Sequence, residues 1–252
     1  MPAVACGGLS GALLVLATSP LGLGWLAFPA LAPLFFASIR ADRLAKAALS
    51  GLACGLVFFG AGFLWVPLNL AGQAWVVWAV GVPLLALPVA AITALLATIN
   101  RRFGSGTALC VAPALWVALE VVRAFGPFGI GWLRLGHALA PWPVLIQLAA
   151  VGGVGLVSAW AAGVGAALAH AAASRRVAAW TLPVALLAIG SLFGVGVLAT
   201  TDLHVEPRFA VAAVQPSVPA GERFVAARFD ANLARLLEGS ETLFPFDYIE
   251  SI

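Results

Sequence analysis

Long apolar stretches alternate with short polar breaks over the first four-fifths of the chain. A helix needs about 20 mostly apolar residues to cross the hydrocarbon core of a bilayer, where every backbone polar group must be satisfied internally. The pattern predicts an all-α multi-pass membrane bundle of about seven transmembrane helices. The predicted spans are Val4 to Ser19, Trp25 to Ile39, Ala47 to Val66, Ala74 to Ile99, Ala108 to Val122, Pro143 to Ala173 and Val177 to Ala199.

The pattern changes after Ala199. Residues 208–215 form a short apolar run with β-branched side chains, which predicts a buried strand. From Glu222 to Glu238 the apolar positions recur at helical spacing. A short α/β fragment is therefore expected to follow the bundle. One strand and one helix cannot enclose a stable core alone, so this fragment must lean on the bundle or on a further partner.

Composition agrees with a membrane protein, since 63% of the residues are hydrophobic, 9% are charged and the mean hydropathy is +1.06. Residues 1–199 hold only two acids, Asp42 and Glu120, against nine bases, whereas residues 200–252 hold eight acids and four bases. The bases are scattered between apolar segments, so the net charge of +3 does not indicate a nucleic-acid partner. Three cysteines exclude a disulfide-rich scaffold.

The positions of Lys and Arg predict an orientation, because short cytoplasmic loops carry an excess of these bases. Bases lie at residues 40–46, 101–102 and 175–176, while the intervening loops near Pro20 and at residues 67–73 have none. The amino terminus is therefore expected in the cytoplasm and the residues from Thr200 onward outside. The outer segment from Arg123 to Trp142 is the exception, since it contains two arginines.

Two groups of residues are candidates for chemistry at the outer side. Glu120 is the only acid inside an apolar run, and Arg123 follows three residues later on the same helical face, where the two can pair. The pair is either a salt bridge that fixes a helix end or an anchor for a lipid headgroup or for an outer domain. Trp132, followed by Arg134 and His137 in a Gly-rich segment, is either an interfacial anchor or part of a mouth for lipid.

The sequence contains no metal-ligand spacing, phosphate-binding loop or Gly-x-Ser-x-Gly elbow, so we expect neither a metal nor a cofactor. Residues 200–252 contain no Cys and no Lys. Covalent acyl transfer through a thiolate therefore has no nucleophile in the outer segment.

Ordered short motifs extend over nearly the whole chain. They are Ser19-Pro20 with Trp25, Gly60 to Val66, Pro113 to Trp116 with Glu120 and Arg123, Gly131-Trp132, Gln147, Gly152 to Gly155, and Val214-Gln215. With these motifs the chain resembles the apolipoprotein N-acyltransferases, which are multi-pass enzymes of the bacterial inner membrane with an outward-facing nitrilase-like domain.

The resemblance implies transfer of an acyl chain from a phospholipid to the amino group of the lipidated amino-terminal cysteine of a lipoprotein. It implies a Cys thiolate that carries the acyl group, a Glu base and a Lys that stabilises the oxyanion. It also implies location in the inner membrane, with the carboxyl-terminal segment in the periplasm. Phe224 occupies an aromatic position near the first strand, and we expect Glu120, Arg123, Trp132 and Phe224 to contact substrate.

The sequence departs from the family after its first strand and helix. The Trp-Pro-Glu, Lys and Cys positions of the family have no counterparts, so we assign no catalytic residue. We expect a transmembrane domain at 1–199, the opening strand and helix of a nitrilase-like domain at 200–238 and an unrelated or disordered tail at 239–252. A chain truncated in this way is expected to be inactive alone. The alternatives are a non-enzymatic lipid-binding or scaffold subunit and, less favoured for want of ionisable groups at the midplane, a transporter.

Overall fold

The computed structural model of the chain describes residues 2–18, 22–70, 72–125, 129–174, 176–200, 214–215, 217–219 and 225–241. These residues form helices joined by turns, and no strand occurs among them. The α-helices are α1 (Ala3–Ala17), α2 (Ala27–Ala30), α3 (Ala32–Arg40), α4 (Leu44–Gly62), α5 (Trp65–Leu70), α6 (Ala74–Ala124), α7 (Pro143–Ile146), α8 (Ala149–Ser174), α9 (Thr181–Thr200) and α10 (Phe229–Glu241). The 3-10 helices are η1 (Gly24–Leu26), η2 (Leu135–Leu139), η3 (Val177–Trp180) and η4 (Ala226–Arg228).

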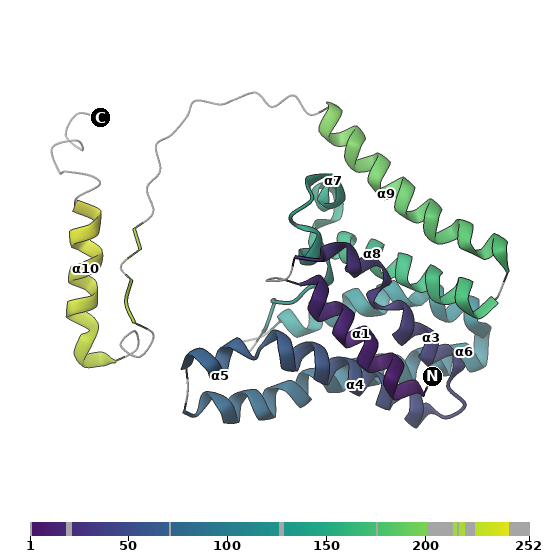
Figure 1. The fold of residues 1–252 in the computed structure, drawn as a ribbon, viewed down its shortest axis with the longest axis horizontal. Coiled ribbons are helices and arrows are strands. Elements are labelled where there is room, and N and C mark those ends of the chain that lie inside the picture. The colour runs from purple at the N-terminus through teal and green to yellow at the C-terminus, as the bar shows by residue number, and fades with distance from the viewer. Residues whose placement is uncertain are drawn as a thin grey trace.

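The helices from α1 to α9 pack as a bundle (Figure 1). α4 contacts both α1 and α6, α8 contacts α6 and α3, and α9 lies against α8 and α7. Aromatic and branched apolar side chains fill the space between the helices, with Phe35 and Phe59 the largest that are almost fully buried. α1 and α4 approach closely at Gly7, where any side chain would clash with the main-chain oxygen of Ser50. Small residues at helix contacts are typical of membrane bundles.

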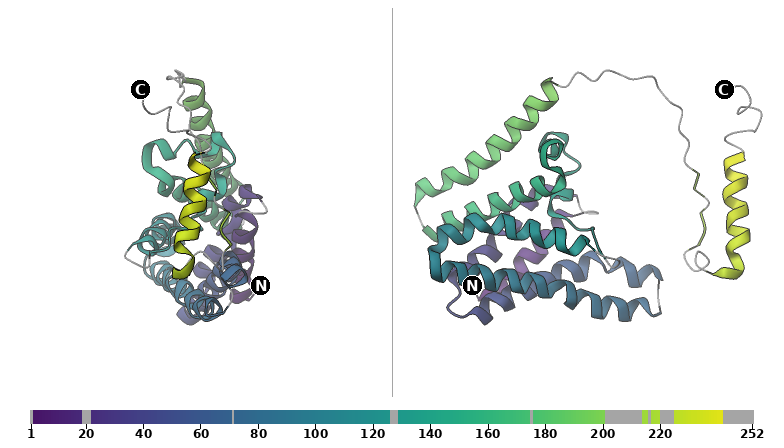
Figure 2. Two further views of the ribbon diagram at one scale, coloured as in Figure 1. Left: turned by 90° about the vertical axis from the view of Figure 1, so that its left-hand side faces the viewer. Right: turned by 180° about the vertical axis from the view of Figure 1, so that it is seen from behind.

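α6 consists of two helices that meet at Gly104, which has φ of 84° and ψ of 165°. Glycine adopts this positive φ without the steric cost that a Cβ brings. The chain reverses direction there, so the two arms lie beside each other (Figure 2). The predicted spans Ala74 to Ile99 and Ala108 to Val122 therefore lie in separate helical arms, which meet at Gly104.

Four helical segments are long and apolar enough to cross a membrane: Leu44–Leu70, Ala74–Ala124, Ala149–Ser174 and Val177–Thr200. Ala3–Ala17 and Gly24–Arg40 are shorter apolar helices. Each predicted span thus overlaps a helix, while the count of seven crossings stays a prediction. Within the described helices, non-helical dihedral angles fall at Gly104, Gly152 and Gly153.

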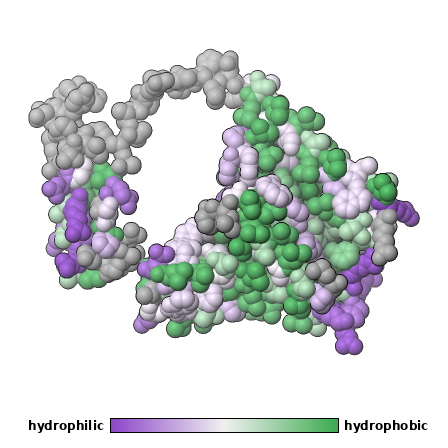
Figure 3. Space-filling model, in the orientation of Figure 1, coloured by the Kyte–Doolittle hydropathy of each residue, from purple (hydrophilic) through white to green (hydrophobic). Residues whose placement is uncertain are grey.

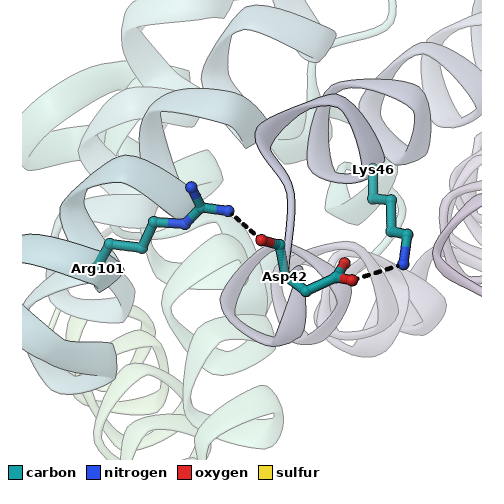
Figure 4. A network of polar contacts seen from close by, with 3 residues as sticks. All are labelled: Asp42, Lys46 and Arg101. Atoms are coloured by element: carbon teal, nitrogen blue, oxygen red, sulfur yellow. Dashed lines mark hydrogen bonds and ion pairs between the residues drawn. The ribbon is translucent and has the colours of Figure 1, made fainter.

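The predicted basic loops lie together at one end of the bundle, which we call the basic end (Arg40, Arg43, Lys46, Arg101, Arg102 and Arg176). Arg40 donates a hydrogen bond to the Ala173 carbonyl (2.9 Å), which ties α3 to the end of α8. Arg101 donates to the Asp42 carbonyl (2.7 Å), and the carboxylate of Asp42 pairs with Lys46 (2.8 Å; Figure 4). On the face drawn in Figure 3, hydrophobic residues cover most of the bundle and hydrophilic residues gather near its basic end.

The carboxyl-terminal segment is described only in part. Most of the predicted strand at residues 208–215 lies outside the described residues, and Val214 and Gln215 have no regular secondary structure. The helix predicted from Glu222 to Glu238 overlaps η4 and α10. α10 ends at Glu241, and the rest of the predicted tail lies outside the described residues.

Candidate functional site

Glu120 lies in the second arm of α6, at the end of the bundle opposite the basic end, and only 3% of its surface is exposed. Its Oε1 atom accepts a hydrogen bond from Trp116 Nε1 (3.0 Å), one helical turn earlier. The same oxygen accepts a hydrogen bond from the main-chain nitrogen of Leu135 (2.7 Å). Leu135 begins η2, and the first N–H groups of a helix have no partner within it. The carboxylate therefore fixes the start of this short helix to α6.

A second buried acceptor holds the next residue of η2. The main-chain nitrogen of Gly136 donates to Ser158 Oγ (2.9 Å), which belongs to α8. A Cβ at Gly136 would lie 2.8 Å from the carbonyl oxygen of Val154, so only glycine fits between η2 and α8. The outer loop is thus bound at adjacent residues to two different helices.

Arg123 holds the loop just before η2. Its Nη1 and Nη2 atoms donate to the main-chain carbonyls of Trp132 (2.6 Å) and Leu133 (3.2 Å). Leu133 has a positive φ of 56°, which is uncommon for a residue with a branched side chain. The guanidinium also lies over the ring of Phe59, 5.1 Å from its centroid. Arg123 therefore joins the loop to both α6 and α4 and stabilises a strained turn.

This arrangement replaces the predicted pairing of Glu120 with Arg123. Within the described residues these two side chains form no ion pair, and the one ion pair is Lys46–Asp42. Glu120 is directed to the N–H groups of Trp116 and Leu135, whereas Arg123 is directed to carbonyls of the loop. Both side chains bind the same loop instead of each other.

The loop positions Trp132 over an apolar cavity of about 220 Å³. The ring of Trp132 lies 5.4 Å from that of Trp65 and 6.4 Å from that of Phe63, measured between centroids. The cavity is lined by Phe63, Val66, Val77, Trp78, Gly81, Val82, Leu85, Ile130 and Trp132. Since 58% of Trp132 is exposed, this side chain borders the opening. An apolar cavity next to an exposed aromatic group suits a hydrocarbon chain.

Several polar atoms at this end have no hydrogen-bond partner among the described residues. They are Glu120 Oε2, Arg123 Nε and Arg134 Nε, and each is buried.

The imidazole of His137 lies at the surface of the same end. Partial loss of its contact with solvent lowers its pKa, and the positive charge of Arg134 lowers the pKa further. His137 is therefore mainly neutral at neutral pH. In the described part of the chain no three His, Cys, Asp or Glu residues are grouped to hold a metal ion.

Comparisons with known proteins bear on this arrangement. Residues 10–167 match the family model described as the apolipoprotein N-acyltransferase N-terminal domain. The chain belongs to the apolipoprotein N-acyltransferase family. The match includes the Glu120 and Arg123 contacts, the loop at residues 129–142 and Trp132.

Individual relatives carry the same family name. An apolipoprotein N-acyltransferase from Geobacter metallireducens is 34% identical over 151 residues, which cover 58% of this chain and 29% of the relative. One from Vibrio parahaemolyticus is 31% identical over 199 residues, covering 73% and 37%. One from Brucella suis is 32% identical over 230 residues, covering 83% and 43%. The chain thus spans less than half the length of these apolipoprotein N-acyltransferases.

Three of the four predicted site residues in this family member lie around one loop: Glu120 and Arg123 bind it, and Trp132 is part of it. Phe224, the fourth, lies outside the described residues. Ser158 and Phe59 also belong to the site, and no sequence pattern pointed to them. Ser158 accepts a hydrogen bond from the loop and Phe59 lies under the guanidinium of Arg123, and both contacts join residues far apart in the sequence.

The cysteines lie away from this site. Cys6 and Cys54 are buried, as expected for small apolar side chains. Cys110 is exposed and lines a different cavity, between the second arm of α6, α8 and α9.

Proposed function

We propose that this chain forms the membrane module of an apolipoprotein N-acyltransferase and that its outer cavity receives an acyl chain of the donor phospholipid. One observation carries the proposal: Glu120 and Arg123 hold the outer loop, and Trp132 of this loop lines an apolar cavity at its opening. The bundle lies in the bacterial inner membrane with the basic end in the cytoplasm. The residues after Thr200 lie in the periplasm, where the lipoprotein is the acyl acceptor.

In this proposal Glu120 and Arg123 are positioning residues. Their hydrogen bonds hold the loop that carries Trp132, so they set the shape of the opening. Trp132 contacts the lipid, and Phe224 contacts substrate on the side of the nitrilase-like segment. The unpaired oxygen of Glu120 is available to a water molecule or to a polar headgroup.

Labelling by a photoactivatable phospholipid tests the location of the acyl chain. The purified full chain is reconstituted in vesicles with a phospholipid that carries a diazirine on one acyl chain, and the labelled peptides are identified by mass spectrometry. We expect labelling to concentrate in peptides containing Val77 to Leu85 and Ile130 to Trp132. Trp132→Ala reduces this labelling, whereas Trp180→Ala, which changes an exposed tryptophan of η3, leaves it unchanged. Equal labelling of all lipid-facing helices would refute the proposal.

Residues 1–252 alone are expected to transfer no acyl chain, because residues 200–252 contain neither Cys nor Lys. The test is expression in bacteria depleted of their own N-acyltransferase. We expect no rescue of growth and no triacylated lipoprotein by mass spectrometry. Rescue by this chain alone would contradict the expected inactivity.

The alternative function is a non-enzymatic scaffold whose outer segment binds a separate protein. One observation favours it: α10 exposes an apolar row of Phe229, Leu233, Leu236 and Leu237, each at least 40% exposed. Such a row is typical of a helix that packs against a partner. Co-purification of a separate nitrilase-like polypeptide, lost on Leu233→Glu with Leu237→Glu, supports this function. Retention of that polypeptide by the double variant contradicts it.

A further inference from the structure

A groove at the basic end has both charged and apolar walls, as a site for the headgroup and acyl chains of a phospholipid requires. It has a volume of about 490 Å³ and lies between the start of α1, the end of α3 and the start of α4. Arg40, Asp42 and Lys46 line its polar part. Val4 and Leu49, each 50% exposed, line its apolar part together with Phe36.

The guanidinium of Arg40 is held in place, but most of its N–H donors form no hydrogen bond to the described residues. One of its nitrogens donates to the Ala173 carbonyl, and its central carbon lies 5.5 Å from the centroid of the Phe36 ring. The described residues provide no other hydrogen-bond acceptor for this side chain, and guanidinium has five N–H donors. The remaining donors match the geometry of a phosphate group.

Charges around the groove favour an anion. Lys46 donates a hydrogen bond to Asp42 that lowers the pKa of this exposed carboxyl group, so Asp42 stays ionised and is neutralised by Lys46 (Figure 4). The lining residues then carry one net positive charge, from Arg40. Arg43, Arg101 and Arg102 add positive charge at the same end. A zwitterionic headgroup gains less from this excess of positive charge than a headgroup with a net negative charge.

We propose that the groove at the basic end binds an anionic phospholipid, with its phosphate on Arg40 and Lys46 and its acyl chains along Val4 and Leu49. The site lies at the opposite end from the cavity under Trp132, and it does not depend on the proposed acyl transfer. The bound lipid contacts the beginning of α1, the end of α3 and the start of α4.

Native mass spectrometry of the delipidated full chain in detergent tests the proposal, with phosphatidylglycerol and phosphatidylethanolamine of the same chain length as probes. We expect phosphatidylglycerol to bind at least about tenfold more tightly than phosphatidylethanolamine. Arg40→Gln weakens phosphatidylglycerol binding about fivefold or more, and Lys46→Gln weakens it at least as much, because it also leaves the negative charge of Asp42 unpaired in the groove. Asp42→Asn strengthens it, which distinguishes a binding effect from loss of folding.

Arg102→Gln is the matched control, because it removes the same charge at the same end but outside the groove. We expect it to change phosphatidylglycerol binding less than twofold. Glycerol phosphate, which has the headgroup chemistry without acyl chains, should not displace the lipid at equal concentration. Equal binding of the two phospholipids, equal effects of Arg40→Gln and Arg102→Gln, or displacement by glycerol phosphate would each overturn the proposal.

Discussion

Replacing Glu120 by alanine tests whether this carboxylate holds the outer loop. The change removes the acceptor of two hydrogen bonds, from the Trp116 indole at 3.0 Å and from the Leu135 main-chain nitrogen at 2.7 Å. A buried donor that loses its partner costs about 1–3 kcal/mol. We therefore expect the local opening free energy at Leu135 to fall by about 1–3 kcal/mol, with a somewhat larger loss in the free energy of global unfolding.

Hydrogen–deuterium exchange of the purified chain in detergent measures this loss. The peptide that contains Leu135 should exchange about 5 to 150 times faster in Glu120→Ala than in the unmodified chain. In Glu120→Gln the amide oxygen still accepts both hydrogen bonds, so exchange should change by a smaller factor. Peptides of α4 report on the bundle and should be unaffected.

Trp116→Phe separates the two hydrogen bonds, because it removes the indole donor and leaves the bond to Leu135 in place. We expect this variant to lower stability without faster exchange at Leu135. Equal exchange at Leu135 in Glu120→Ala and Glu120→Gln, or acceleration by Trp116→Phe equal to that by Glu120→Ala, would refute the assigned role of the carboxylate.

Three further predictions concern the same loop. A lysine at position 123 cannot bind two carbonyls in the fixed geometry of a guanidinium, so Arg123→Lys should lower the free energy of unfolding by about 1–3 kcal/mol. Acrylamide should also quench the fluorescence of Trp132 more readily; the signal of this residue is obtained by subtracting the fluorescence of a Trp132→Phe variant. Gly136→Ala would push against the Val154 carbonyl and should lower the thermal unfolding midpoint by an amount equivalent to about 1–3 kcal/mol; an unchanged midpoint contradicts the close packing. The pKa of His137 is lowered in the folded chain, so the unfolded chain binds more protons as pH falls below about 6.5. Stability should therefore decrease as the pH falls below about 6.5, and His137→Asn should remove part of this decrease in pH-dependent unfolding curves.

Much of the helical framework was predictable because each long helix consists of one or two apolar runs. The joint of α6 illustrates the limit: the break between Ile99 and Ala108 was visible in the sequence, but its compression into a single positive-φ residue at Gly104 was not. Two glycines, Gly104 and Gly106, follow Arg102, and the sequence does not indicate which of them carries the bend. The position of the basic loops at one end was predictable, because they alternate along the chain with uncharged loops and every second loop of such a bundle lies at the same end.

Three of the four expected site residues, Glu120, Arg123 and Trp132, lie around one loop, but their hydrogen-bond partners were not predicted. Glu120 stood out as the one acid within an apolar run, and helical spacing correctly places it on the same arm as Arg123. The spacing alone favoured an ion pair. In the structure both side chains instead form hydrogen bonds with main-chain groups of the following loop. Every residue has such main-chain groups, so the sequence does not indicate which of them will be the partners.

The two arms of α6 meet at a single residue, Gly104, and both arms contribute to the candidate site. The first arm supplies Val77 and Trp78 to the cavity, and the second supplies the carboxylate that fixes the covering loop. An arm of about 20 residues is about 30 Å long, so a rotation of about 3° at Gly104 shifts its tip by about 1.5 Å. The angle between the arms at Gly104 therefore sets the distance between a wall of the cavity and the loop that borders its opening.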